Sequence, residues 1–382
     1  MRKKLITAFL CVLITALCAP GAAAMKLDGV TVSAKSAILI NSQTGEVLYE
    51  KNPDDKMLIA STTKIMTAVV VLDKCGMDDI VEVSPDAANV EGSSAYLRAG
   101  EKLTVRELLY ALMLSSGNDA AAALAIHVSG SIEKFAGDMN AKAKELGLEN
   151  TSYKNPHGLD AEGHYSTARD LAKLTQYALK NNDFKDIVST KTAAVGSRSL
   201  TNHNKLLWNI DGAIGVKTGY TKAAGRILVS AVERNGISYI CVTLNDPDDW
   251  DDHTNIYNKV FSQIEQRTVC RAGEVLDTVS VVSGDKETVN VVYKNDVTLS
   301  VQTGTEITAE VELPQFIYAG VEKGDTAGRV TYYSGEEKLA ETELVFGDTV
   351  SVDGEEKLSF FGKIKRLIRL SFKYSPSGTL NY

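Results

Sequence analysis

The spacing of apolar residues changes along the chain, and this change constrains the fold more than any other feature. Two short apolar runs at residues 37–40 and 47–49, separated by polar residues, indicate a β-hairpin. Runs at 227–232 and 239–244 are joined by an Asn-Gly pair, which favours a tight hairpin turn. Helical spacing fills the region between the hairpins, at residues 61–74, 105–113, 120–128, 132–146 and 167–179. The order predicts one α/β domain whose sheet joins segments that are distant in sequence.

The pattern changes again after about Cys270. Apolar and polar residues then alternate between Gly, Asp and Asn turns, and the alternating apolar positions include Val279, Val281, Val289, Val291, Val297, Leu299 and Val301. Alternation of this kind is typical of strands with one buried face. A chain of 382 residues is also long for a single domain. We therefore predict a first domain over residues 25–270 and a smaller all-β domain over 271–356, which serves as a spacer or interaction module.

The N-terminal residues have the pattern of an export signal. A basic cluster at residues 2–4 precedes an apolar run over 5–19 and three alanines at 22–24. The run is short for a membrane-spanning helix, so a signal peptide over residues 1–24 is favoured over an uncleaved anchor. Its removal leaves Cys75, Cys241 and Cys270, whose number and spacing indicate buried thiols rather than a disulfide framework.

A segment near the C-terminus, residues 358–374, combines apolar and basic residues near helical spacing. The apolar positions are Phe360, Phe361, Ile364, Leu367, Ile368 and Phe372, and the basic ones are Lys363, Lys365, Arg366, Arg369 and Lys373. Such a helix lies in a membrane interface, with basic side chains at anionic headgroups. We predict an amphipathic membrane-anchor segment over residues 357–382. The exported chain is then either peripheral on the outer face of the cytoplasmic membrane or secreted. A helix docked on its own domain is the alternative.

Charge and histidine spacing exclude several classes of partner. The net charge of -8 disfavours a nucleic-acid partner, because no strongly basic domain is present to neutralise phosphates. The five histidines form no H-E-x-x-H motif and the cysteines form no C-x-x-C pair. No metal site and no cofactor are therefore predicted. The sequence contains no G-x-S-x-G motif, which argues against a Ser-His-Asp triad that would use His157 or His164.

Three short motifs carry the candidate chemistry, and they occur in the order Ser61-Thr62-Thr63-Lys64, Ser116-Gly117-Asn118 and Lys217-Thr218-Gly219. Each motif alone is common, and Ser61 alone is typical of a helix N-cap. Their combination resembles the S-x-x-K, S-x-N and K-T-G set of penicillin-binding proteins and serine β-lactamases.

Residue spacing explains how the first motif can act. Ser61 and Lys64, three residues apart on a helix, lie on one face within reach of each other. A seryl hydroxyl needs a base, and Lys64 can serve only when it is neutral, which burial and the charge of Lys217 both favour. The start of a helix also offers the backbone N–H of Ser61 as one oxyanion donor. Ser61 is thus the predicted nucleophile and Lys64 its base.

The other two motifs supply a proton path and a substrate site. Ser116 can relay a proton from Lys64 to the leaving amine, and Asn118 offers an amide to the substrate peptide. Lys217 and Thr218 present a charge and a hydroxyl suited to a terminal carboxylate, which favours removal of a C-terminal residue. Gly219 lets the substrate backbone lie against the strand.

Further stretches make the resemblance to one family specific. The chain resembles the D-alanyl-D-alanine carboxypeptidases of the low-molecular-mass penicillin-binding proteins at residues 92–97, 155–159, 163–170 and 219–225. The resemblance implies an antiparallel sheet with flanking helices and a helical subdomain, followed by a β-rich domain and an amphipathic anchor. It implies a peptidoglycan stem peptide ending in D-Ala-D-Ala as substrate, β-lactams as inhibitors, and the N–H of Tyr220 as second oxyanion donor. His203 stands where some relatives carry arginine.

Two other functions compete with the carboxypeptidase. A class A β-lactamase uses a glutamate in an E-x-x-L-N context, and residues 145–149 are only a near miss. A non-catalytic β-lactam sensor or wall-binding module could keep Ser61 and Lys64 without turning over peptide. No cytoplasmic signalling domain is evident in the sequence.

Overall fold

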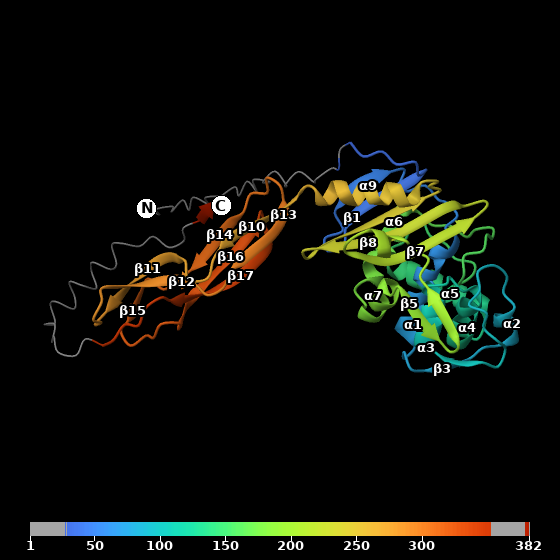
Figure 1. Cartoon of the computed structure of the whole chain (residues 1–382), viewed down its shortest axis with the longest axis horizontal. Helices are drawn as coiled ribbons and strands as arrows, with labels where there is room; N and C mark the ends of the chain where they lie inside the picture. Colours follow the sequence, from blue (N-terminus) through green and yellow to red (C-terminus); the bar gives the residue numbers. More distant parts are fainter. Residues whose placement is uncertain (1–26, 28, 353–378, 382) are drawn as a thin grey trace, which may run out of the picture.

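The computed structural model describes residues 27, 29–352 and 379–381, which form a helix-containing part and a sheet-rich part arranged side by side along the long axis (Figure 1). The predicted signal peptide and the predicted amphipathic helix lie outside these residues. Of the segment 357–382, only strand β18 (Thr379–Asn381) is described. No helix within the described residues is both long and apolar enough to cross a membrane.

A five-stranded antiparallel sheet forms the centre of the first part, in the order β2-β1-β9-β8-β7. Its strands are β1 (Ser36–Asn41), β2 (Val47–Lys51), β7 (Ala213–Thr221), β8 (Gly225–Arg234) and β9 (Ile237–Leu244). Strand β1 pairs with β9, so the N-terminal hairpin joins a strand about two hundred residues later, and this prediction is confirmed. Asn235 and Gly236 both have positive φ angles, of 52° and 80°, which suit the tight turn between β8 and β9.

Helices cover both faces of this sheet, because alternate residues of each strand point to opposite sides. Ile38 of β1 packs into the larger core with α1, α3, α4, α5, α6 and α7, whereas its neighbour Leu39 packs under α9. Figure 1 shows α9 on one side of the sheet and the helical subdomain on the other. The helices are α1 (Lys64–Lys74), α3 (Val105–Met113), α4 (Asn118–Ser129), α5 (Ile132–Glu145), α6 (Ala168–Ala178), α7 (Asn182–Ser189) and α9 (Asp249–Phe261).

The five expected helices are confirmed to within three residues at each end, and two longer helices were not foreseen. The first expected helix, 61–74, divides into a 3-10 turn, η1 (Ala60–Thr63), and α1. The unforeseen helices α7 and α9 begin among Asn and Asp residues, whose polarity conceals the apolar stripe that follows. The remaining short elements are β3 (Ile80–Glu82), α2 (Pro85–Ala88), β4 (Lys102–Thr104), β5 (Thr192–Val195), β6 (Arg198–Thr201) and α8 (Leu206–Asn209).

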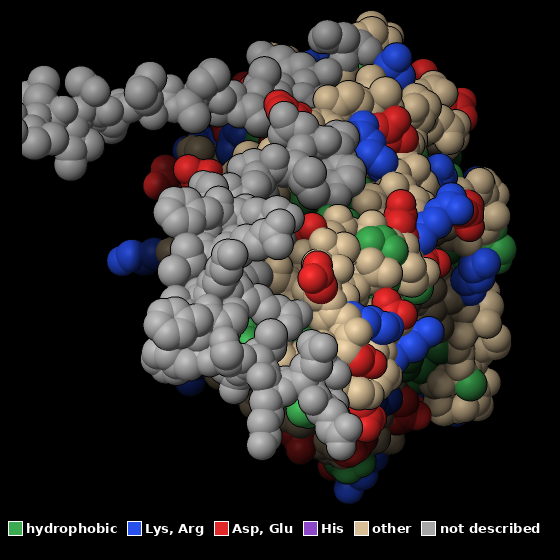
Figure 2. Space-filling view, turned by 90° about the vertical axis from the view of Figure 1, so that its left-hand side faces the viewer, with side chains coloured by type: hydrophobic (Ala, Val, Ile, Leu, Met, Phe, Trp, Pro, Cys, Tyr) green, Lys and Arg blue, Asp and Glu red, His purple; other side chains and the backbone are tan. Residues whose placement is uncertain are grey.

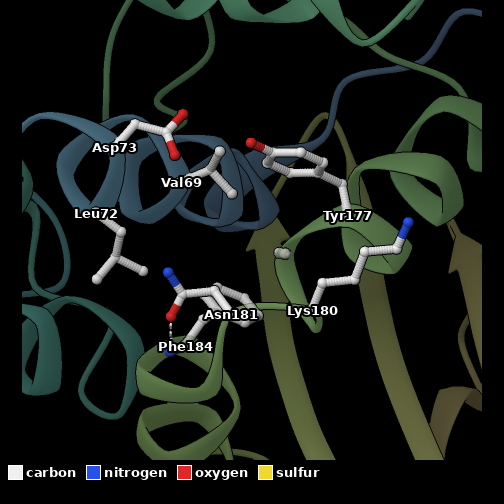
Figure 3. A pocket seen from close by; sticks show the side chains of 8 residues that line it. Val69, Leu72, Asp73, Tyr177, Lys180, Asn181 and Phe184 are labelled. Atoms are coloured by element: carbon white, nitrogen blue, oxygen red, sulfur yellow. Dashed lines mark hydrogen bonds between the residues drawn. The ribbon is translucent and has the colours of Figure 1, made fainter.

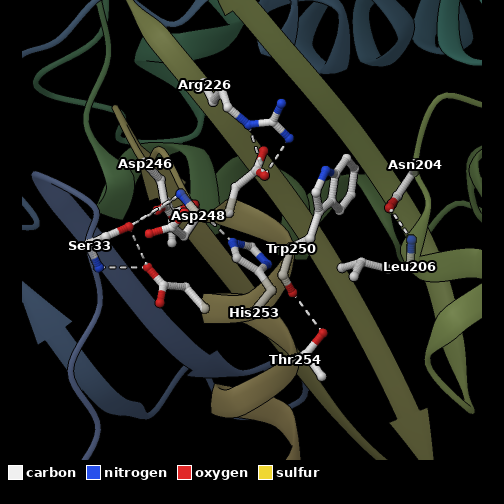
Figure 4. Close-up of polar contacts among 12 residues, drawn as sticks. Ser33, Asn204, Leu206, Arg226, Asp246, Asp248, Trp250, His253 and Thr254 are labelled. Atoms are coloured by element: carbon white, nitrogen blue, oxygen red, sulfur yellow. Dashed lines mark hydrogen bonds and ion pairs between the residues drawn. The ribbon is translucent and has the colours of Figure 1, made fainter.

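A buried polar network fastens α9 to the sheet and to the N-terminal segment (Figure 4). The hydroxyl of Ser33 donates to Asp246 at 2.6 Å and is 2.9 Å from a carboxylate oxygen of Asp252. Burial raises the pKa of Asp246 to about 6, and the nearby charge of Asp252 also raises it. His253 lies between Ser230 and Thr243, and burial lowers its pKa to about 3, so its ring is neutral. These hydrogen bonds tie α9 to the N-terminal segment and to the sheet.

A pocket of about 270 Å³ lies beside α1, between α6 and α7 (Figure 3). Its floor is apolar, with Val69 and Leu72 of α1 facing Phe184, and its rim carries Asp73 and Tyr177. Asn181, also on the rim, accepts a hydrogen bond from the N–H of Phe184 and caps α7.

The sheet-rich part contains a seven-stranded sheet in the order β15-β11-β12-β17-β16-β14-β18 and a β10–β13 pair. The expected alternating valines, among them Val279, Val281, Val289 and Val291, form its core, so the all-β prediction is confirmed. Strand β10 precedes the expected boundary at 270 yet pairs with β13. The strands are β10 (Ile264–Cys270), β11 (Val275–Val282), β12 (Thr288–Tyr293), β13 (Val297–Gln302), β14 (Thr308–Glu312), β15 (Phe316–Tyr318), β16 (Thr326–Ser334) and β17 (Glu337–Phe346).

The described surface at this end of the molecule carries acidic and basic side chains intermixed (Figure 2). Ion pairs join neighbouring strands of the sheet-rich part, such as Arg329 of β16 with Glu312 of β14 at 3.0 Å. Exposed pairs of this kind contribute little to stability.

Candidate active site

The expected nucleophile, Ser61, lies in a tight turn that the surrounding backbone holds in place. Ala60, just before it, has a positive φ of 43°, which is unusual for a residue with a side chain. Gly158 packs directly against this turn, and a Cβ at that position would lie 1.8 Å from the carbonyl oxygen of Ala60. The φ angle of Gly158 is also positive, at 90°, which side chains with a Cβ disfavour. Both the close contact and the φ angle therefore require glycine at this position. The turn therefore depends on a loop about one hundred residues later.

The side-chain nitrogen of Lys64 has three neighbours, and the direction of its hydrogen bond with Ser61 depends on its protonation state. Nζ is 2.7 Å from Oδ1 of Asn118, 2.7 Å from the carbonyl oxygen of His157 and 3.0 Å from Oγ of Ser61. The first two are acceptors only and take two N–H bonds. A neutral amine has no further N–H, so its lone pair points to the Ser61 hydroxyl and can accept that proton. A neutral Lys64 could thus accept the proton of the Ser61 hydroxyl.

Burial supports the neutral state of Lys64. Its side chain is fully buried, and this burial lowers its pKa well below the ordinary value; the charge of Lys217 lowers it further, while Asp119 opposes the shift. Burial also lowers the pKa of Lys217, to about 7. An anionic substrate beside Lys217 would keep that lysine protonated, because an opposite charge favours the charged form. The two lysines can therefore hold different protonation states at neutral pH.

In the Ser116-Gly117-Asn118 motif, the side chain of Asn118 forms hydrogen bonds with other residues of the site, whereas that of Ser116 does not. The amide of Asn118 accepts from Lys64 through Oδ1 and donates to the carbonyl of Glu91 through Nδ2, at 2.7 Å. Gly92 leaves room for this amide, because a Cβ there would lie 2.7 Å from Nδ2. Ser116 is buried with a positive φ of 58°, and its hydroxyl has no hydrogen-bond partner among the residues that the structure describes. That hydroxyl is free to engage a substrate or a transferred proton.

A buried carboxylate next to this motif orders the adjoining loop. Asp119 accepts hydrogen bonds from the N–H groups of Ala95 and Leu97, both at 3.0 Å, and from the hydroxyl of Ser94 at 2.7 Å. Several donors on one carboxylate make such a buried charge tolerable. The loop in turn leaves the ring of Tyr96 82% exposed. The sequence alone gave no reason to select Asp119, which differs from any surface aspartate only by these contacts.

The Lys217-Thr218-Gly219 motif lies on β7, which is the edge strand of the sheet beside η1. A Cβ added to Gly219 would lie 3.3 Å from the backbone nitrogen of Ser61, so this strand passes close to the nucleophile. Nζ of Lys217 donates to the carbonyl of Thr218 at 2.9 Å. Tyr220 follows on the same strand with a side chain that is 65% exposed. An edge strand can pair with an extended peptide, which fits a substrate backbone laid along β7.

The two histidines near the site act through structure. His157 contributes its backbone carbonyl to Lys64, and burial lowers the pKa of its ring to about 3. Nδ1 of His164 accepts from the N–H of Lys154, so Nε2 carries the proton and donates to the hydroxyl of Thr63 at 2.8 Å. Burial lowers the pKa of this ring to about 4. Both rings are neutral and neither contacts Ser61 through a hydrogen bond.

The structure thus brings three of the expected residues, Ser61, Lys64 and Asn118, into one hydrogen-bonded group, with Gly219 against it. Ser116 is buried but forms no hydrogen bond to this group. The roles expected of Thr218 and of the Tyr220 N–H concern a bound substrate. The sequence did not indicate the His157 carbonyl, because a backbone acceptor has no signature in residue type.

Two parts of the chain match known protein families. Residues 22–248 match the family described as D-alanyl-D-alanine carboxypeptidase. The chain belongs to this family. Residues 265–352 match the family described as penicillin-binding protein 5, C-terminal domain. The expected enzyme class, a serine-type D-alanyl-D-alanine carboxypeptidase, and the expected two-part fold are confirmed.

Similar proteins extend over most of the chain. D-alanyl-D-alanine carboxypeptidase DacF of Bacillus subtilis is 34% identical and aligns over 89% of this chain and 92% of its own length. The structure of penicillin-binding protein 5 from Haemophilus influenzae covers 84% of this chain and 98% of its own, with 29% identity and a TM-score of 0.61. The Streptomyces K15 DD-transpeptidase covers 61% of this chain and 98% of its own, with 38% identity and a TM-score of 0.58.

Proposed function

We propose that this carboxypeptidase removes the terminal D-alanine from a peptidoglycan stem peptide ending in D-Ala-D-Ala, through an acyl-enzyme on Ser61. The observation that carries the proposal is the set of three neighbours around Lys64. Two carbonyl acceptors occupy its N–H bonds and leave its lone pair for the hydroxyl of Ser61 at 3.0 Å. This arrangement supports a serine nucleophile with a lysine base.

The first half of the reaction forms an ester. Oγ of Ser61 attacks the carbonyl carbon of the penultimate D-alanine while its proton passes to Nζ of Lys64. The negative oxygen that develops accepts hydrogen bonds from the backbone N–H groups of Ser61 and Tyr220. The C–N bond then breaks, and the proton reaches the departing amine of D-alanine through the hydroxyl of Ser116. Water hydrolyses the ester with Lys64 again as base, which restores the Ser61 hydroxyl.

The terminal carboxylate of the substrate supplies the specificity for a chain end. The proposal assigns it to Lys217 and the hydroxyl of Thr218, which lie on the edge strand beside the nucleophile. A carboxylate there would pair with the Lys217 ammonium and keep it charged. Asn118 orients Lys64 through Oδ1, and binding of the substrate amide by Asn118 requires exchange of one of its present partners.

Release of D-alanine tests the activity directly. Purified protein is incubated with a peptide ending in D-Ala-D-Ala, and D-alanine is measured. The wild type and Ser199→Ala, a change at an exposed serine of β6, should release D-alanine, and Ser61→Ala should not. Equal release by Ser61→Ala would overturn the assignment of the nucleophile.

A β-lactam distinguishes the carboxypeptidase from its two rivals. Penicillin should add one long-lived acyl group at Ser61, seen as a mass increase that Ser61→Ala lacks. Rapid hydrolysis of the antibiotic would indicate a β-lactamase. A stable adduct without any D-alanine release would indicate a sensor. The similar Streptomyces K15 protein is named a DD-transpeptidase. An acceptor amine should therefore be included in the assay, to detect transfer of the acyl group from Ser61 to the amine.

We also propose that the chain is exported and held at the outer face of the cytoplasmic membrane by residues 357–382. The support is the sequence pattern of a signal peptide and of a basic amphipathic helix. A protein ending at Glu356 should be recovered in the soluble fraction, whereas the full chain should sediment with membranes. Sedimentation of both forms would refute the anchor.

A further inference from the structure

Three side chains of metal-ligating type meet on the surface of the helical subdomain, outside the active site. Cys75, Asp79 and His127 each offer one ligand atom, and these three atoms all lie within 4.8 Å of one another. Cys75 is partly buried, and Asp79 and His127 are exposed. The proposed hydrolysis uses none of them.

Hydrogen bonds hold the backbone segments that carry Cys75 and Asp79. The N–H of Cys75 donates to the carbonyl of Val71 and closes the end of α1. The carbonyl of Asp79 accepts from the N–H of Val105 at 2.9 Å, which ties the loop to the start of α3. The N–H of Gly76 donates to Oδ2 of Asp79 at 2.8 Å and orients that carboxylate. His127 lies in the last turn of α4.

Electrostatics favour a cation at this position. Both α1 and α4 end beside the cluster, and the carbonyl groups at a helix C-terminus carry partial negative charge. Asp79 adds a full negative charge. The nearby ammonium of Lys74 is 2.7 Å from the carboxylate of Asp138, which partly neutralises it.

We propose that Cys75, Asp79 and His127 form a zinc site, with the fourth position open to water. Sulfur, nitrogen and oxygen donors together are the ligands that Zn²⁺ prefers. Zn²⁺ bonds of about 2.0–2.3 Å place tetrahedral ligand atoms roughly 3.5 Å apart, so no pair of ligand atoms, all within 4.8 Å of one another, has to approach by more than roughly 1.3 Å. The thiol of Cys75 releases its proton to water as the Zn–S bond forms.

The position of the site links it to the catalytic residues. Lys64 begins α1 and Asn118 begins α4, and their side chains are hydrogen-bonded at 2.7 Å. The zinc would join the opposite ends of the same two helices, roughly 14–17 Å from Lys64 and Asn118 at about 1.5 Å per residue. Bound Zn²⁺ should therefore stabilise the pair of helices that holds the catalytic lysine.

Cobalt is the probe for the site, because a Co²⁺–thiolate bond absorbs light and Zn²⁺ does not. Full-length protein, freed of metal by a chelator and kept reduced, is titrated with Co²⁺. One equivalent should give a thiolate-to-cobalt absorption band that Zn²⁺ then removes. Cys75→Ser and His127→Ala should abolish the band, and Asp79→Asn should weaken binding. Asp78→Asn, the adjacent acid outside the cluster, is the matched control and should bind as the wild type does.

A thermal melt gives an independent readout. Zn²⁺ should raise the melting temperature of the wild type and of Asp78→Asn, and it should leave that of Cys75→Ser and His127→Ala unchanged. If one of these variants does not fold, the other decides. Absence of the band in the wild type, or its persistence in both variants, would overturn the proposal.

Discussion

Replacement of Gly158 by alanine should disable the nucleophile without removing any catalytic group. The new Cβ would lie 1.8 Å from the carbonyl oxygen of Ala60, 2.4 Å from its carbonyl carbon and 2.8 Å from Oγ1 of Thr63. An ordinary carbon–oxygen contact is about 3.3 Å, so the turn that carries Ser61 must move by roughly 1.5 Å. The positive φ of Gly158 adds strain of order 1 kcal/mol for any residue with a Cβ.

A displacement of this size has a large expected effect on rate. Misplacement of a reacting group by about 1 Å can cost roughly 100-fold, so kcat/KM for D-alanine release should fall by about two orders of magnitude or more. Acylation by a fluorescent penicillin should slow in parallel, because both reactions begin with the same attack. Circular dichroism should show that the fold persists, with a lowered melting temperature.

Gly137→Ala is the matched control. Gly137 lies inside α5, and a Cβ there would meet nothing within 4 Å. Alanine should stabilise this helix by about 0.5–1 kcal/mol and leave the acylation rate unchanged. Wild-type acylation by a folded Gly158→Ala protein would refute the reasoning that this loop holds the nucleophile turn.

Three further changes probe other parts of the structure. Gly92→Ala places a Cβ 2.7 Å from Nδ2 of Asn118, so the acylation rate should fall by roughly 10-fold or more while bulk helix content stays constant. Lys217→Gln should raise KM for a peptide with a free terminal carboxylate far more than for its carboxamide, because only the carboxylate forms an ion pair with Lys217. Equal effects on both peptides would contradict the assignment. The pKa of Asp246 is raised to about 6, so the folded state binds this proton more tightly than the unfolded state does. The free energy of unfolding should therefore fall as pH rises from about 4 to 6. Urea titrations should show a flatter pH dependence for Asp246→Asn.

Sequence pattern was sufficient where one chemical rule dominated. The alternation of Val279, Val281, Val289 and Val291 predicted buried strand faces, and the Asn235-Gly236 turn predicted the β8–β9 hairpin. The helix over Val105–Met113 begins with a capping box formed by Thr104 and Glu107, which is a local signal in the sequence itself. These elements depend on neighbours in the chain, and neighbours are visible in a sequence.

Pattern was insufficient where contacts between distant segments decide the outcome. Helical spacing over 61–74 suggested one helix. In the structure the first residues form a separate 3-10 turn, η1, and Gly158 of a distant loop packs against Ala60 in that turn. Helix α9 was missed because its acidic start is stabilised by distant partners: Ser33 bonds to Asp252, and Arg226 pairs with Asp249. The cluster at Cys75, Asp79 and His127 has no motif spacing, since α4 brings its histidine from about fifty residues further along the chain.

Lys64 shows why the three motifs can indicate a chemistry without establishing the protonation state of the proposed base. The motifs place Ser61, Lys64 and Asn118 in one site, yet an amine with only those two partners could still donate to the hydroxyl of Ser61. The carbonyl of His157 changes this balance, because with Asn118 it takes both N–H bonds of a neutral amine. Burial lowers the pKa of Lys64 well below its ordinary value and so shifts the balance toward the neutral form. The proposed base function of Lys64 thus depends on the backbone carbonyl of His157. The same loop carries Gly158, which packs against the turn of Ser61, so one loop positions both partners of the proposed proton transfer.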